Sequence, residues 1–111
     1  MAMFDFLKDV GTYQDRKIDR FEKDKLIVDT AKVSDGKQPY ETGISHPEYN
    51  GGSWVIVDMY PTVDLAKHGH NHWVEVMTAE NLPDKLVDCG NAELAQLMIA
   101  LGKPLEFIRK S

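Results

Sequence analysis

Residues Ser53 to Thr78, SWVIVDMYPTVDLAKHGHNHWVEVMT, decide the fold that this sequence predicts. The side chains from Trp54 to Tyr60 are β-branched or apolar with a single charge at Asp58, a composition that predicts a strand. Because apolar groups fall on both faces, we expect a central strand, with one face under a helix and the other covered or offered to a partner. Pro61 cannot donate to a ladder and ends the strand.

A helix is predicted from Val63 to Thr78, with Thr62 as its N-cap. At helical spacing one side is apolar and is expected to pack on the sheet, while the other is polar. The inward set is Ala66, Gly69, His70, Trp73, Val76 and Met77, and the outward set is Asp64, Lys67, His68, Asn71, His72 and Glu75. Gly69 indicates either the close approach of another backbone or a tolerated defect.

Alternating apolar segments separated by turn residues predict an antiparallel β-meander of about four strands, with two helices packed on it, in a single α+β domain spanning residues 1–111. The predicted upstream strands are Arg16–Glu22, Lys25–Val33 and Gln38–Ser45. The remaining predicted elements are a helical turn at Asp84–Val87, a second helix at Asn91–Leu101 capped by Asn91, and an edge strand within Pro104–Lys110. Residues 1–11, where Ala2–Val10 has helical apolar spacing, would form a docking helix or a tail. We expect Trp54, Ile56, Trp73 and Met77 in the core.

Composition excludes several classes of partner. The 111 residues include 13 Lys and Arg against 18 Asp and Glu, a net charge of −5, with basic and acidic residues interleaved, which argues against a nucleic-acid surface. No apolar run approaches the roughly 20 residues of a membrane span, and the start lacks the pattern of a secretory signal. The lone Cys89 fits a reducing compartment. We expect a cytoplasmic protein, or a virion protein if a phage encodes it.

A metal site is the most specific local hypothesis. Asp64, His68, His72 and Glu75 follow one another at spacings of four, four and three along one helix face, and His at i and i+4 can both ligate Zn²⁺ or Ni²⁺. The alternative, which we favour, is a solvated helix face, so no cofactor is expected.

Candidate binding residues fall in two groups. Polar and aromatic side chains gather at Tyr40, His46, Tyr49 and Asn50, before a Gly-Gly turn typical of binding loops. His70 and Trp73 form the second group, in which His70 is either a base or ligand-gripping group facing a pocket or, as we favour, a core histidine with hydrogen-bonded ring nitrogens. Cys89 is expected to be a half-buried structural thiol, and no residue is assigned as catalytic.

The pattern YETGISHPEYNGGSWVIV resembles small uncharacterised proteins of bacterial and phage genomes, as do the residues that follow it: Y-x-T, Ala66, Gly69-His70, Trp73-Val74 and Met77-Thr78. The likeness covers most of Asp15 to Thr78 and implies a phage or prophage accessory role, with no activity to transfer. The strand-turn-helix also resembles half of a ferredoxin-like dimeric α+β barrel monooxygenase, in which a helix histidine faces a substrate cavity. This chain departs from that family because a meander replaces the β-α-β opening.

Taken together, these patterns predict a non-enzymatic binding or assembly module, forming a homo-oligomer or joining other protein subunits, as a phage or prophage accessory or structural subunit. Apolar residues near both ends favour association; they are Phe4, Phe6, Leu7, Phe107 and Ile108. The alternative is a small ferredoxin-like enzyme or ligand-binding protein that uses a pocket at His70.

Overall fold

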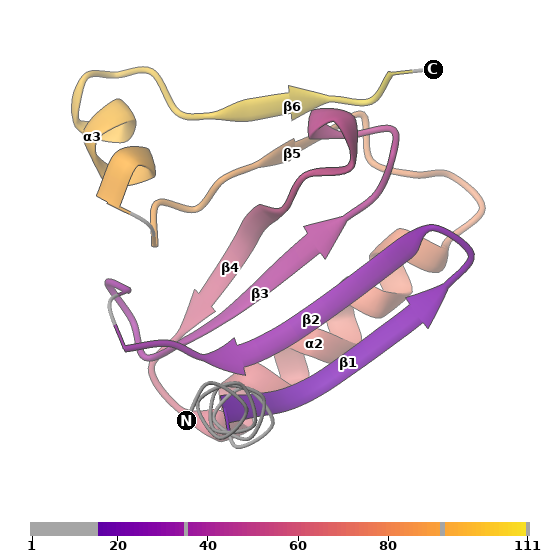
Figure 1. Cartoon of the computed structure of the whole chain (residues 1–111), viewed down its shortest axis with the longest axis horizontal. Helices are drawn as coiled ribbons and strands as arrows, with labels where there is room; N and C mark the ends of the chain where they lie inside the picture. Colours follow the sequence, from indigo (N-terminus) through magenta and orange to yellow (C-terminus); the bar gives the residue numbers. More distant parts are fainter. Residues whose placement is uncertain (1–15, 35, 92, 111) are drawn as a thin grey trace, which may run out of the picture.

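The main sheet consists of four antiparallel strands in consecutive order (Figure 1). The structure, a computed structural model, describes residues 16–34, 36–91 and 93–110, with the backbone alone for 93–96, so the predicted helix or tail at Ala2–Val10 lies outside the described residues. The strands are β1 (Lys17–Lys23), β2 (Leu26–Lys32), β3 (Tyr40–Ser45) and β4 (Val55–Tyr60). This order confirms the predicted meander and the α+β class.

Strand β4 lies at the edge of this sheet, so the prediction of a central strand is wrong. Its apolar character on both faces has another cause. One edge pairs with β3, and the other is met by a later segment, in which the Cys89 N–H donates to the Ile56 carbonyl at 2.8 Å. A strand enclosed in this way need not carry the charges that protect a free edge.

Helix α2 spans Val63–Thr78, as predicted, and covers one face of the sheet. The Thr62 hydroxyl accepts a hydrogen bond from the Leu65 N–H at 3.3 Å, which confirms the predicted N-cap. Figure 1 views the opposite face, with α2 behind the strands and no described helix in front of them. We call the face that touches α2 the inner face and the opposite one the outer face.

A second, two-stranded sheet pairs β5 (Lys85–Val87) with β6 (Glu106–Ile108), and helix α3 (Glu93–Ala100) lies between them in sequence. The predicted helical turn at Asp84–Val87 is wrong, whereas the predicted edge strand near the C-terminal end is confirmed. In β5 only the central Leu86 is buried, the alternation of a strand, and its pairing partner lies too far along the sequence to be inferred locally. The Asn91 side chain accepts from the Gln38 N–H and donates to Glu41, and its role as the cap of α3 stays a prediction.

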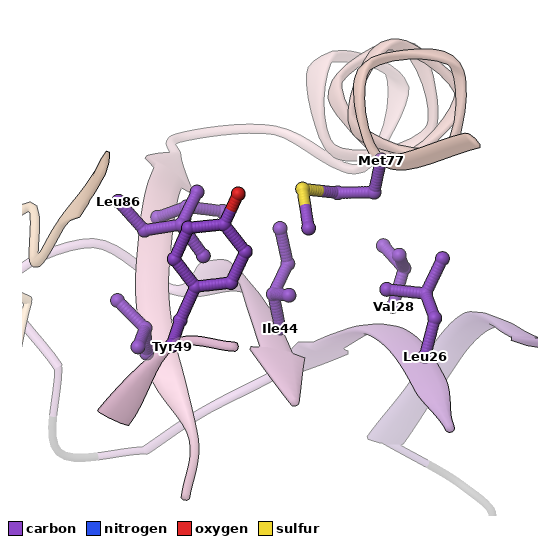
Figure 2. Packing of buried hydrophobic residues seen from close by; sticks show 8 residues of the cluster. Leu26, Val28, Ile44, Tyr49, Met77 and Leu86 are labelled. Carbon is purple, nitrogen blue, oxygen red and sulfur yellow. The ribbon is translucent and has the colours of Figure 1, made fainter. Parts of the chain in front are cut away.

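The core lies between the inner face, α2 and the second sheet, as Figure 2 shows. Its buried members include Leu26, Val28, Ile44, Tyr49, Val55, Val57, Met77 and Leu86. Met77 is therefore confirmed as a core residue, and Trp73 packs against the core while partly buried. The prediction is wrong for Trp54, which is 47% exposed. Strand alternation is the reason: Val55 pairs with Ile44 on the inner face, so its neighbours Trp54 and Ile56 point outward.

Candidate functional site

The predicted binding residues occupy three separate places. His46, Tyr49 and Asn50 lie in the connection between β3 and β4, whereas Tyr40 begins β3 and pairs with Tyr60 at the far end of the sheet. His70 and Trp73 belong to the inward side of α2. The structure therefore does not gather these residues into one site.

Tyr49 has a structural role, because it joins two segments that are distant in sequence. Its side chain is 1% exposed, and its hydroxyl donates to the Pro83 carbonyl at 2.5 Å, which ties the β3–β4 connection to the segment before β5. Burial raises the pKa of Tyr49, so the phenol stays protonated. The His46 ring meets Tyr49 edge-on at 5.6 Å, and its Nδ1 accepts from the Glu48 N–H at 3.1 Å, which leaves Nε2 to carry the proton of the neutral ring.

His46 lines an open cleft of about 510 Å³ between the β1–β2 turn and the C-terminal end of α2. The other lining residues are Lys23, Asp24, Lys25, Leu26, Met77, Thr78, Ala79, Glu80 and Leu82. Two lysines and two carboxylates balance one another around this cleft. It therefore favours no charge on a ligand.

His70 ends a chain of buried hydroxyl groups on the inner face. The Tyr60 hydroxyl lies 2.9 Å from Thr42 Oγ1, which lies 2.6 Å from Thr30 Oγ1, which in turn lies 2.8 Å from His70 Nδ1. His70 is 2% exposed. The chain satisfies polar groups that would otherwise be costly to bury, as in a core histidine.

The protonation of His70 at Nε2 determines which groups donate in this series of hydrogen bonds. Nε2 lies 3.8 Å from a carboxylate oxygen of Asp19, an arrangement that favours the proton on Nε2 and leaves Nδ1 to accept from Thr30. Desolvation by burial lowers the pKa of His70 although Asp19 opposes the shift, and burial raises the pKa of Tyr60 to about 12. Near neutral pH, both side chains are therefore neutral.

The outward histidines of α2 lie as predicted on an exposed face. His68, His72 and Glu75 share with Asn71 a shallow hollow of about 310 Å³, and Asp64 is exposed near the start of the same helix. Within the described residues, no three His, Cys, Asp or Glu side chains converge as they would around a metal ion. Two histidines about one turn apart remain a possible pair of ligands.

The Cys89 side chain is half-buried, as expected. Burial raises the pKa of its thiol to about 11, so the thiol stays protonated at neutral pH.

The outer face of the sheet holds a hollow that sequence reasoning missed. Its volume is about 290 Å³, and its lining residues are Asp29, Ala31, Glu41, Gly43, Trp54 and Ile56. The Trp54 indole lies across Gly43: a Cβ at that position would come within 3.2 Å of indole Cε3 and 3.3 Å of the Ile56 Cδ1 atom. A glycine inside a strand often marks such a close approach, and Gly43 is the signal that could have found this hollow.

Two carboxylates border the same hollow, and neighbouring residues orient both. Glu41 Oε1 accepts from the Asn91 amide nitrogen at 2.6 Å, and Asn91 is held in turn by accepting from the Gln38 N–H at 2.8 Å. Asp29 lies 3.7 Å from the Arg20 guanidinium and is largely buried. The hollow therefore places an aromatic ring beside two carboxylates that contacts within the fold orient.

No protein-family model, curated protein or solved structure matches this chain. Over the described residues, no helix combines the length and the apolar character needed to cross a membrane.

Proposed function

We propose that this protein is a non-enzymatic binding module that docks a segment of a partner protein on the outer face of its four-stranded sheet. The observation that carries the proposal is Trp54, a large aromatic residue that is 47% exposed and whose indole lies against Gly43. Aromatic anchors in preformed hollows supply much of the binding energy of protein interfaces. Burying the exposed indole against a partner would remove apolar surface from water, which is favourable for binding.

The inner face supports this assignment because it is filled. Core side chains and the hydroxyl chain ending at His70 occupy the space between sheet and helix. None of the hollows described above is lined by His70. The enzyme alternative requires a cavity beside that residue, so the outer face is the better supported site.

Self-association and a phage or prophage accessory or structural role remain parts of the proposal. Apolar side chains of the C-terminal part would support self-association, since several are exposed there. They are Val87, Leu97, Ile99, Leu101 and Ile108. The accessory role rests on the sequence resemblance alone.

A peptide-library selection tests the docking function. Peptides enriched on the wild-type protein are measured against Trp54→Ala and against Leu65→Ala, a matched control in which another exposed apolar side chain is removed from α2 on the other side of the sheet. We expect Trp54→Ala to weaken binding at least about tenfold, the effect of a modest hot spot. Leu65→Ala should leave affinity unchanged. A lack of enriched peptides, or equal losses in both variants, would contradict the proposal.

A further inference from the structure

The connection between β3 and β4 places an exposed asparagine directly before two glycines, Asn50-Gly51-Gly52. Asn50 has a φ of 50° and Gly51 a φ of 62°, so both lie in the left-handed region of backbone conformation. A Cβ added at Gly51 would meet no atom of the described residues within 4 Å. The amide group of Asn50 therefore precedes a backbone nitrogen that no side chain of its own residue shields.

An asparagine in this position reacts with its own backbone. The Gly51 nitrogen attacks Cγ of Asn50 once a base in solution has removed the proton of that nitrogen. In any other residue the Cβ would hinder the approach and restrict the backbone rotation that it needs, whereas glycine does neither. The other asparagines, Asn71, Asn81 and Asn91, each precede a residue with a Cβ. Asn50 is therefore the asparagine of this chain that is most prone to the reaction.

The reaction is a substitution at Cγ of Asn50 that changes no oxidation state. A bond forms between the Gly51 nitrogen and Cγ, and the bond between Cγ and Nδ2 breaks. Nδ2 takes up a proton from water and leaves as ammonia, so the product is a five-membered cyclic imide. Water then opens the ring at one of its two carbonyl groups. The result is aspartate, or isoaspartate, whose main chain runs through Cβ and Cγ.

The nitrogen that leaves is the one that connects Asn50 to Trp54. Asn50 Nδ2 donates to the Trp54 carbonyl at 3.4 Å, and neither product has this donor. Both products carry a carboxylate instead, which accepts hydrogen bonds and cannot donate to a carbonyl oxygen. Isoaspartate also lengthens the main chain within a turn, where the Ser53 N–H donates to the Asn50 carbonyl at 3.0 Å. The conversion therefore loosens the segment that leads directly into Trp54.

We propose that Asn50 converts spontaneously to aspartate and isoaspartate, and that this conversion weakens the docking of a partner segment at Trp54. The effect on docking rests on the proposed function and names a way in which that function is regulated. The conversion itself follows from the chemistry of Asn50 and Gly51. The fraction of converted chains rises with time after synthesis, so the fraction competent for docking falls.

Peptide mapping by mass spectrometry of the full chain, aged in mildly alkaline buffer, tests the conversion. Asn81 is the matched control within the chain, because it is also exposed and lies in a loop, yet Leu82 follows it. We expect conversion at Asn50 to be at least about tenfold faster than at Asn81. Ageing at lower pH should slow the conversion at Asn50, because removal of the Gly51 proton requires base. Equal rates at Asn50 and Asn81 would overturn the inference.

Binding of the peptide selected on the wild-type protein tests the consequence. Aged wild-type protein should bind it about threefold to tenfold more weakly than fresh protein, as expected for one lost hydrogen bond. Asn50→Gln, which would have to close a six-membered ring, should bind equally before and after ageing. Asn50→Asp carries the carboxylate from the start and should bind as weakly as the aspartate product.

An unchanged affinity in fully converted protein would overturn the link to docking. If the selection yields no peptide, the proposed docking function fails and the regulatory part of the inference fails with it. The mass spectra decide the conversion at Asn50 in either case, so the two failures are distinguishable.

Discussion

At the scale of single residues, Gly69 shows how a helix position can be fixed by a side chain from another element. The ring of Tyr60 lies against Gly69 so closely that a Cβ there would overlap ring atoms and the hydroxyl. The expected close approach is thus real, but it comes from a side chain and not from another backbone. Tyr60 is 6% exposed and bonded to Thr42, so it has little freedom to move away.

Gly69→Ala should destabilise the protein by about 1–3 kcal/mol, the cost of overpacking, although alanine is the better helix former by about 1 kcal/mol. Urea unfolding measures the change. Replacing Tyr60 with Leu should remove most of the penalty in a double-mutant cycle, whereas Tyr60→Phe should not, because the overlap includes the ring. A stabilised Gly69→Ala variant would contradict the packing described.

His70 should make stability depend on pH below neutrality. Because burial lowers its folded pKa from 6.5, the unfolded chain takes up a proton that the folded chain refuses as pH falls below about 6.5. The stabilising contribution is therefore fully present above that pH and is lost as pH falls toward the lower folded pKa. The urea concentration at the midpoint of unfolding should therefore decrease as the pH is lowered from about 7.5 to about 5.

The exposed His72 provides the matched control for this effect. His70→Gln should flatten the pH dependence across that window, and His72→Gln should preserve it. If the urea midpoint depends on pH equally in the wild type and in His70→Gln, the lowered pKa assigned to His70 is wrong.

At the scale of elements, the hydrophobic period of the sequence predicted the long helix correctly. It did not predict the short strand β5 or the position of β4 in the sheet. The 3.6-residue period and the Thr62 cap predicted α2 with its bounds, and both of its faces, because a long amphipathic pattern averages out local exceptions. Strand β5, with three residues, depends on pairing with β6 and carries too few residues for a period. The position of β4 at the sheet edge depends on a covering segment that is distant in sequence.

Replacing Trp73 should lower the stability of the protein much more than replacing Trp54, whose proposed role is in binding. Trp73 packs on the core, and its indole N–H donates to Asp58 at 3.3 Å, so Trp73→Ala should cost about 3 kcal/mol or more. Trp54 lies on the outer face, and Trp54→Ala should cost about 1 kcal/mol or less. Denaturant unfolding of both variants gives the comparison. Similar costs would mean that the faces of the sheet are wrongly assigned.

The exposed face of α2 should bind added transition metal weakly through two histidines. Zn²⁺ or Ni²⁺ should raise the thermal midpoint by mass action, because the ion binds two ring nitrogens that only the folded helix holds together. His72→Ala should abolish the response. His70→Ala should leave it intact, since that side chain is buried on the other side of the helix, and the reverse result would exchange the two roles.

At the scale of the whole molecule, the exposed apolar side chains of the C-terminal part should make the protein self-associate. Light scattering over a range of concentrations should show a mass above the 12.6 kDa of one chain. Leu101→Asp, at a side chain that is 63% exposed, should shift the protein toward monomer, while Leu65→Asp on α2 should not. A monomer at every concentration would exclude this part of the proposal.

The candidate site was less predictable than the fold because it depends on which side chains adjoin across strands. Asp29 lies on β2, Glu41 on β3 and Trp54 directly before β4, and only the register of these strands brings them around Gly43. The sequence-based candidates His46, Tyr49 and His70 instead have contacts within the fold. Residue type alone could not distinguish a polar group used internally from one offered to a partner.

If the partner segment docks on the outer face, binding should perturb the backbone around Trp54 and leave the surroundings of His70 unchanged. The most direct test is a map of backbone amide shifts in the ¹⁵N-labelled full chain upon addition of the peptide selected on the wild-type protein. We predict that the perturbed amides cluster at Ala31, Glu41, Gly43 and Ile56 around Trp54. Perturbations centred on the cleft at His46, or on His70 and its hydroxyl chain, would contradict the account.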